Sequence, residues 1–234
     1  MEKDGSLLHI YGLCERVAEG ALAEPLNVIT NFAFFATAAL LWRECRANSD
    51  LRGLKIYDIK LLIALIFSIG LCSSIFHLHP TPLTELLDTL VIAIFIIFFF
   101  LSVMVRIVKC KIMETFVCFM AYAGFTHILV TQFPNAMNGS IAYLSTMTTL
   151  IFIALYLNLK RRATARAFLL AAIIGMISLF FRSIDNAVCD KIPIGTHFMW
   201  HMLNGLLIYI VMMQLIRNVN RRARMLREAS LHFA

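Results

Sequence analysis

Apolar residues fall into seven long runs along the chain, and short polar links separate them. The runs cover roughly residues 26–42, 57–76, 83–105, 112–131, 140–159, 164–182 and 195–217. Each is close to the ~20 residues that an α-helix needs to cross a hydrocarbon core of ~30 Å. Lipid offers no hydrogen-bond partners to an open strand edge, so the runs are predicted to be helices. The pattern predicts an all-α membrane protein, a seven-transmembrane helix bundle.

Composition supports this interpretation and excludes a soluble globular protein. Of the 234 residues, 60% are hydrophobic and 15% are charged, and the mean hydropathy is +0.80. A soluble domain has only ~45–50% apolar residues. Residues 1–25 contain no continuous apolar run like that of a cleaved signal, so we expect them to be retained. We therefore expect an external N-terminal segment at 1–25, a seven-helix transmembrane domain at 26–217 and a basic cytosolic tail at 218–234.

Basic residues alternate between the two sides of the predicted bundle. One side has Arg43, Arg46, Arg52, Lys55, Arg106, Lys109, Lys111, Lys160, Arg161, Arg162, Arg166 and the tail residues Arg217, Arg221, Arg222, Arg224 and Arg227. The positive-inside rule then places the N-terminus outside and the C-terminus in the cytosol. This topology explains the formal net charge of +7 without a nucleic-acid partner. The membrane would be a bacterial inner membrane, or the endoplasmic reticulum or Golgi membrane in a eukaryote.

Ionisable residues gather near the external end of the predicted spans. His77 ends the second span, and Asp88 lies one or two turns into the third. Prolines break the helix between them, so the two spans return antiparallel and both side chains can sit at similar depth. His197 and His201, four residues apart, open the seventh span from the same side, and on a helix this spacing places them on one face. Burying ionisable side chains inside a membrane costs free energy, so we expect these residues to have a function.

Three imidazoles suit a catalytic zinc site, because zinc takes nitrogen ligands and keeps one position open for water. Asp88 could serve as the base that deprotonates this water. Ser73, one turn before His77, could stabilise a developing oxyanion or hold the water. The alternative is that these histidines only pack, as we expect for His127, which is alone in the fourth span.

Four sequence blocks resemble the signatures of the alkaline ceramidase family, part of a seven-helix hydrolase superfamily that includes adiponectin receptors. They are residues 23–31, 73–77 with Asp88, 185–189 and 197–201, and the resemblance extends from about Cys14 to the seventh span. It implies zinc held by His77, His197 and His201, with Ser73 and Asp88 in the catalytic shell. It also implies a ceramide-like amide as substrate.

The resemblance further implies an N-terminal acidic calcium site, but the match is incomplete. Glu15 and Glu24 are present, whereas Leu13 replaces the family's Trp and the expected Asn is missing from the stretch at 16–18. Because calcium prefers six to eight oxygen ligands, lost ligands should weaken or abolish binding. In the alternative interpretation, Glu15 and Glu19 lie on a solvated face at headgroup level, and Glu24 and Asn27 only hydrogen-bond around the helix start.

Of the six cysteines, only Cys14 and Cys189 fall on the external side. An oxidising compartment permits a disulfide between them, and the family resemblance also suggests this pairing. Two unpaired thiols are the alternative. We expect Asp185 to organise the loop before the seventh span, by capping or by pairing with Arg182.

The sequence thus predicts an integral membrane, zinc-dependent hydrolase that acts on a linear amide. It would cleave ceramide or a related N-acyl lipid to a fatty acid and a sphingoid base or amine. The leading alternative is a heptahelical receptor or lipid-binding protein with a structural zinc. A transporter that uses the His and Asp residues as a proton relay is a third hypothesis.

Overall fold

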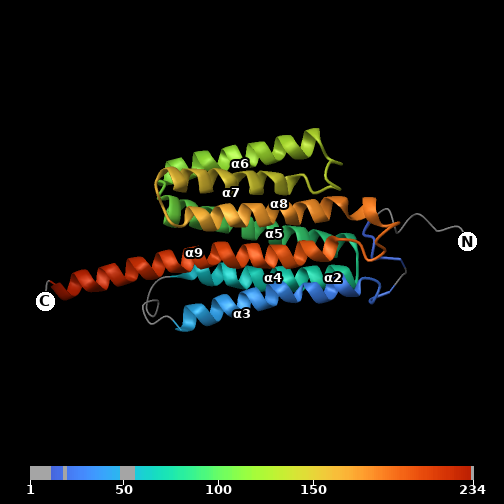
Figure 1. Cartoon of the computed structure of the whole chain (residues 1–234), viewed down its shortest axis with the longest axis horizontal. Helices are drawn as coiled ribbons and strands as arrows, with labels where there is room; N and C mark the ends of the chain where they lie inside the picture. The colour runs from blue at the N-terminus through green and yellow to red at the C-terminus, as the bar shows by residue number, and fades with distance from the viewer. Residues whose placement is uncertain (1–11, 18–19, 48–55, 233–234) are drawn as a thin grey trace, which may run out of the picture.

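The computed structural model describes residues 12–17, 20–47 and 56–232, and all its regular elements are helices (Figure 1). They are α2 (Pro25–Thr30), α3 (Phe32–Ala47), α4 (Tyr57–Leu78), α5 (Pro82–Val103), the π-helical η2 (Met104–Val108), α6 (Ile112–Gln132), α7 (Ala142–Leu159), α8 (Ala165–Val188) and α9 (His197–His232). Within these ranges, seven helical segments are long and apolar enough to cross a membrane. The predicted seven-helix bundle is therefore confirmed.

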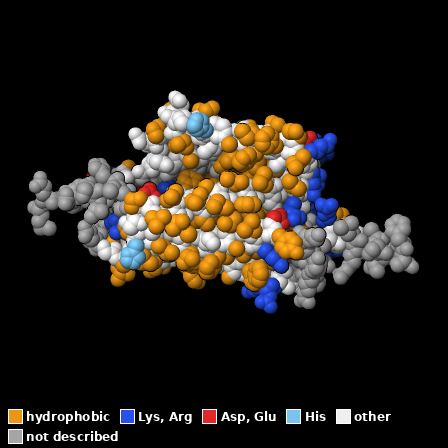
Figure 2. Space-filling view, turned by 180° about the vertical axis from the view of Figure 1, so that it is seen from behind, with side chains coloured by type: hydrophobic (Ala, Val, Ile, Leu, Met, Phe, Trp, Pro, Cys, Tyr) orange, Lys and Arg blue, Asp and Glu red, His pale blue; other side chains and the backbone are white. Residues whose placement is uncertain are grey.

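The outer surface has the character expected of a protein in lipid. Hydrophobic side chains cover the flank of the bundle, while Lys and Arg side chains gather at one end (Figure 2). That end holds the C-terminal end of α3, the start of α4, the α5–α6 and α7–α8 connections and the C-terminal half of α9 (Figure 1). The basic residues thus separate along the bundle axis as the sequence suggested, and the cytosolic position of this end stays a prediction.

Three helix limits differ from the predicted runs. The first span is divided at Asn31, which separates α2 from α3. The sixth span extends to Val188, so Asp185 lies inside α8 and not in the following loop. The seventh continues to His232 through the predicted tail, because no Pro or Gly interrupts residues 206–232 and Arg, Leu, Met and Ala favour helix.

Helix α9 is the central element that brings distant segments to one site. It packs against α8 on one side and against α3, α2 and η2 on the other. The approach to α3 is close because residue 205 is Gly: a Cβ there would lie 2.9 Å from the Cβ of Ala33. The Thr37 hydroxyl also donates to the Gly205 carbonyl at 3.0 Å. This contact places α2 beside the first turns of α9.

The turn between α4 and α5 sets these two helices side by side. Pro82 stands at the start of α5, where a missing N–H costs nothing. The Thr81 side chain accepts from the Thr84 N–H, and the Thr84 hydroxyl accepts from the Thr81 N–H, which completes a capping box. The tight reversal brings His77, in the last turn of α4, next to the beginning of α5.

Candidate metal centre

Three histidines from two helices meet inside the bundle. His77 comes from the end of α4, and His197 and His201 come from the first two turns of α9. Their exposed fractions are 1%, 4% and 2%, and their potential ligand atoms all lie within 4.8 Å of one another. The ring centroids are 4.9–5.3 Å apart. The structure therefore brings together the three histidines that the sequence placed at one depth.

The outer nitrogen of His77 is held by a carboxylate. Its Nδ1 lies 2.5 Å from Oε2 of Glu24, the residue just before α2. An ionised carboxylate has only acceptors, so Nδ1 carries the proton and Nε2 presents a lone pair. This arrangement, in which a carboxylate orients a histidine and makes it more basic, is typical of metal-bound histidines.

His201 is held in the same way by a hydroxyl. Its Nδ1 lies 3.0 Å from Oγ1 of Thr30. Since that hydroxyl donates to the Leu26 carbonyl at 2.7 Å, it accepts the Nδ1–H of His201. The Nε2 atoms of His77 and His201 then face each other at 3.3 Å with lone pairs on both. Two such lone pairs repel unless a cation lies between them, so the donor set fits a metal ion.

Asp88 and Ser73 lie next to this cluster. Ser73 is 3% exposed, and the Asp88 carboxyl group interacts with its hydroxyl and lies close to His77. The Asp88 Oδ1 atom is buried and has no hydrogen-bond partner among the described residues. A buried polar atom without a partner is rare in proteins and calls for an explanation. The Asp88 Oδ1 atom is therefore an available hydrogen-bond acceptor beside the three imidazoles.

Asp185 fixes the start of α9. Its Oδ1 accepts from the backbone N–H groups of Thr196 and His197, at 2.5 Å and 2.9 Å. These N–H groups at the helix start have no partner within the helix, so a carboxylate from α8 supplies the missing cap. Gly195 precedes them with a φ of +65°, and a Cβ at this position would collide with the Asp185 carboxylate. Asp185 thus sets the position of His197.

Comparison with known families agrees with this geometry. The profile of the ceramidase family matches residues 13–231. The chain belongs to the ceramidase family. Searches among curated proteins and among solved structures found no match. Membership supports a membrane hydrolase that acts on an amide bond of a lipid.

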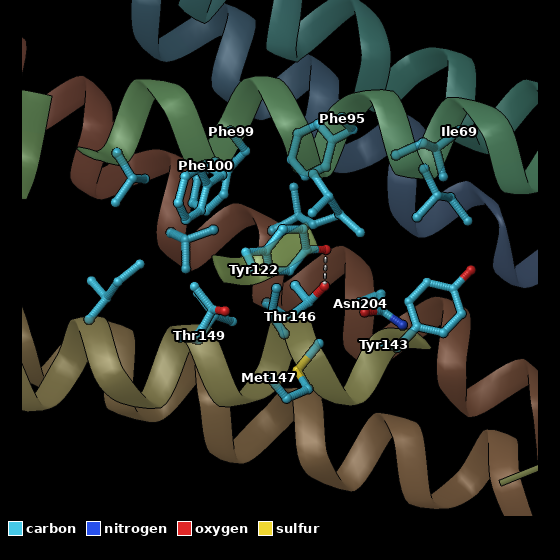
Figure 3. Close-up of a pocket in the computed structure, with 18 of the residues that line it drawn as sticks. Ile69, Phe95, Phe99, Phe100, Tyr122, Tyr143, Thr146, Met147, Thr149 and Asn204 are labelled. Atoms are coloured by element: carbon cyan, nitrogen blue, oxygen red, sulfur yellow. Dashed lines mark hydrogen bonds between the residues drawn. The ribbon is translucent and has the colours of Figure 1, made fainter. Parts of the chain in front are cut away.

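An apolar pocket lies inside the bundle beside the histidine cluster. Its cavity measures about 80 Å³ and lies between α3, α4, α5, α6, α7 and α9 (Figure 3). Phe34, whose ring lies 6.2 Å from that of His201, and Trp200 line the end near the cluster. Phe95, Phe99 and Phe100 line the other part, and the few polar groups include Thr149, Asn204 and the hydrogen-bonded pair Tyr122 and Thr146. The pocket has the character of a site for a hydrocarbon chain.

The two glutamates of the expected calcium site are engaged by hydrogen-bond donors of the chain itself. Glu15 is buried and accepts from the N–H groups of Leu26 and Asn27, at 2.6 Å and 2.9 Å. Glu24 accepts from the Arg16 Nε, the Asn27 side chain and His77. All four carboxylate oxygens are thus occupied, and a guanidinium cation stands among them. These residues do not fit a calcium ion, which needs free oxygen ligands.

Glu24 is held as an ion. Burial raises the pKa of its carboxyl group, but the hydrogen bonds from His77 and Asn27 and the charge of Arg16 outweigh burial, so the pKa lies below its usual value. The alternative interpretation of Glu15 as a solvated residue is wrong, since Glu15 is 8% exposed and caps the first free N–H groups of α2. Glu19, which that interpretation also named, lies outside the described residues. The expected hydrogen bonding of Glu24 around the helix start is present, through Asn27.

Arg182 is a site residue that sequence reasoning treated only as a partner for Asp185. Its guanidinium lies over the rings of Tyr143 and Trp200, at 5.7 Å and 5.2 Å, and its Nη1 is 3.5 Å from Nδ1 of His197. Its Nε donates to the Ser140 hydroxyl at 2.6 Å. The sequence signal that could have identified Arg182 was its position as a basic residue at the external end of a span. Arg182 places a fixed positive charge beside His197.

Cys14 and Cys189 form a disulfide in the structure. The Cys14 N–H also donates to Oδ2 of Asp185 at 3.0 Å. The segment that carries Glu15 and Arg16 is therefore tied to the end of α8. Two other histidines stay outside the cluster, since His79 and His127 are both exposed.

Proposed function

We propose that the protein is an integral membrane, zinc-dependent amidase that hydrolyses ceramide or a closely related N-acyl lipid. One observation carries this proposal: inward-facing nitrogens of buried histidines adjoin a buried carboxylate oxygen that has no hydrogen-bond partner among the described residues. An apolar pocket lies beside them and suits an acyl or sphingoid chain. Membership in the ceramidase family supports the amide bond as the target.

Zinc is the metal that we expect, because three imidazoles are nitrogen ligands of intermediate softness. His77, His197 and His201 would hold it. When bound, zinc supplies Lewis-acid polarisation of the amide carbonyl and makes water acidic enough to lose a proton near neutral pH.

The chain's own residues would carry the proton transfers. Asp88 Oδ1 takes the proton from the attacking water, since it is an acceptor without another partner in the part of the chain that the structure describes. The Ser73 hydroxyl, beside Asp88, holds this water or donates to the carbonyl oxygen as it becomes negative. Protonated Asp88 then returns the proton to the departing amine. The products are a fatty acid and a sphingoid base, or the corresponding amine.

The topology that accompanies this function places the site near the external side. We expect residues 1–25 outside, the catalytic domain at 26–217 in the bilayer and residues 218–234 in the cytosol, because basic side chains gather at the end where α9 ends. The pocket lies between helices within the bundle, so a membrane-dissolved lipid is the natural substrate.

The test is lipid turnover by the purified protein with a panel of N-acyl lipids, with and without a chelator. We expect chelator-sensitive release of fatty acid. His197→Ala should lose both metal and activity, whereas Asp88→Ala should keep metal and lose activity. His127→Ala, which removes an exposed histidine outside the cluster, is the matched control. Full activity and full zinc content in both site variants would refute the assignment.

The same experiment separates the alternatives. A receptor or lipid-binding protein with a structural zinc would retain zinc and lipid without releasing fatty acid. A transporter that relays protons through the cluster would work without metal.

A further inference from the structure

Arg16 is a buried arginine that joins the N-terminal segment to the metal centre. Its Nε donates to Oε1 of Glu24, and its Nη2 donates to the backbone carbonyl of His77 at 2.9 Å. Glu24 in turn holds Nδ1 of His77 through Oε2. Exposed fractions of 9%, 1% and 1% for Arg16, Glu24 and His77 show that water does not screen this chain of contacts.

The charges around Glu24 are balanced without a metal ion. Arg16 supplies one full positive charge against the Glu24 carboxylate. The Glu15 carboxylate, 8% exposed, is stabilised separately by the two N–H groups at the start of α2, where the helix dipole favours a negative group. A divalent cation at Glu24 would have to displace the guanidinium and then lie beside it. Removing Arg16 would leave Glu24 buried and facing only neutral donors.

We propose that Arg16 is an internal cation that takes the place of a bound calcium ion and positions Glu24 against His77. In this chain the cation that links the N-terminal segment to the metal centre is a side chain of the protein itself, so the link is independent of free divalent cations. Arg16 is a positioning residue, because it contacts the backbone of one metal ligand and the carboxylate that orients its ring. The activity readouts rest on the proposed function, and the binding and stability readouts do not.

The first test compares the native protein in calcium and in a calcium-selective chelator. The midpoint of thermal unfolding and the lipid-hydrolysis rate should be the same in both, and calorimetric titration with calcium chloride should give no binding heat. A calcium-dependent rise of the midpoint, or saturable binding at micromolar to millimolar calcium, would overturn the proposal. If no lipid is hydrolysed at all, the proposed function fails, while binding and unfolding still decide the role of Arg16.

The second test removes or changes the cation. Arg16→Ala should lower kcat by ~10–100-fold with KM unchanged, because a group that orients a metal ligand typically contributes this much and Arg16 does not line the pocket. The visible absorption of the cobalt-loaded protein should change with it, as His77 shifts. Guanidinium chloride at millimolar concentration should restore part of the rate. Arg46→Ala, which removes an exposed arginine at the far end of α3, should change none of these.

The third variant, Arg16→Glu, turns the internal cation into an oxygen ligand. The site then has three neighbouring carboxyl groups, so we expect a protein that is less stable than the native one in chelator and is stabilised by added calcium. Should this variant fail to fold, Arg16→Lys is the substitute: it keeps the charge and should retain stability without calcium. Native cobalt absorption and native kcat in Arg16→Ala would show that Arg16 is only structural and would overturn its positioning role.

Discussion

The Nε2 atoms of His77 and His201 lie 3.3 Å apart, although 124 residues separate them in the chain. Both rings are turned this way by partners on their opposite nitrogens, Glu24 for His77 and Thr30 for His201. These two partners belong to the beginning of the first span. The candidate metal centre is therefore built by α4 and α9 but oriented by α2 and the residue before it.

Thr30 should control metal affinity through the tautomer of His201. Thr30→Val keeps the shape but removes the acceptor of the Nδ1–H, which lets the proton move to Nε2 and block the ligand lone pair. We expect a ~10–100-fold loss of metal affinity, measured by competition with a chelator. Thr30→Ser should restore it. Thr37→Val removes a hydroxyl that bonds the Gly205 carbonyl, away from the histidines, and should leave metal affinity unchanged. Equal affinity in Thr30→Val and the native protein would contradict this role.

Asp185 should contribute to stability as a shared cap. Asp185→Ala leaves the N–H groups of Cys14, Thr196 and His197 without their acceptor. We expect the free energy of unfolding to fall by about 2 kcal/mol, the scale of a lost cap with buried unpaired groups. Thermal or denaturant unfolding in detergent measures it. Asp190→Ala, at an exposed position, should be close to neutral. A loss no larger than that of this control would show that Asp185 is not the cap that holds α9.

The fold was predictable because its signal is local and strong. An apolar run of about 20 residues must be a helix in lipid, and the Pro80–Pro82 turn requires the second and third spans to return antiparallel. The same reasoning set His77 at the depth of His197 and His201, and the structure groups them. The expected depth of each histidine along the membrane normal was therefore enough to predict that the three lie together.

The contacts that orient the site were not predictable, because they depend on side-chain geometry between distant segments. Glu15 looked like a solvated residue, since a charged group in a short N-terminal segment usually faces water. Burial becomes favourable only because α2 begins beside it and offers two N–H groups. No sequence pattern indicated the role of Arg16 either, because its partners Glu24 and His77 are 8 and 61 residues away.

The disulfide should stabilise the external end of the bundle moderately. Cys14 and Cys189 are 175 residues apart, which for a soluble chain would place the effect near the top of the 2–5 kcal/mol range. Spanning helices already hold the two ends on one side of the membrane, so we expect about 2 kcal/mol. The Cys14→Ser substitution and a reductant should each lower the unfolding midpoint by the same amount. Adding the reductant to the Cys14→Ser variant should lower it no further. Cys110→Ser, a free cysteine, is the control. Additive effects of variant and reductant would show that this bond is not the one being reduced.

The pocket should set which chain lengths are cleaved. Thr149 lines it from α7, and Thr149→Phe would fill part of the hydrocarbon site without touching the histidines (Figure 3). Because a pocket discriminates by ~10–200-fold per methylene that no longer fits, kcat/KM for long-chain N-acyl lipids should fall at least tenfold. Short-chain substrates should be hydrolysed nearly as before, and zinc content should not change. Leu155→Phe, on the exposed face of the same helix, should leave the chain-length profile intact. Unchanged long-chain turnover in Thr149→Phe would mean that the substrate chain lies elsewhere.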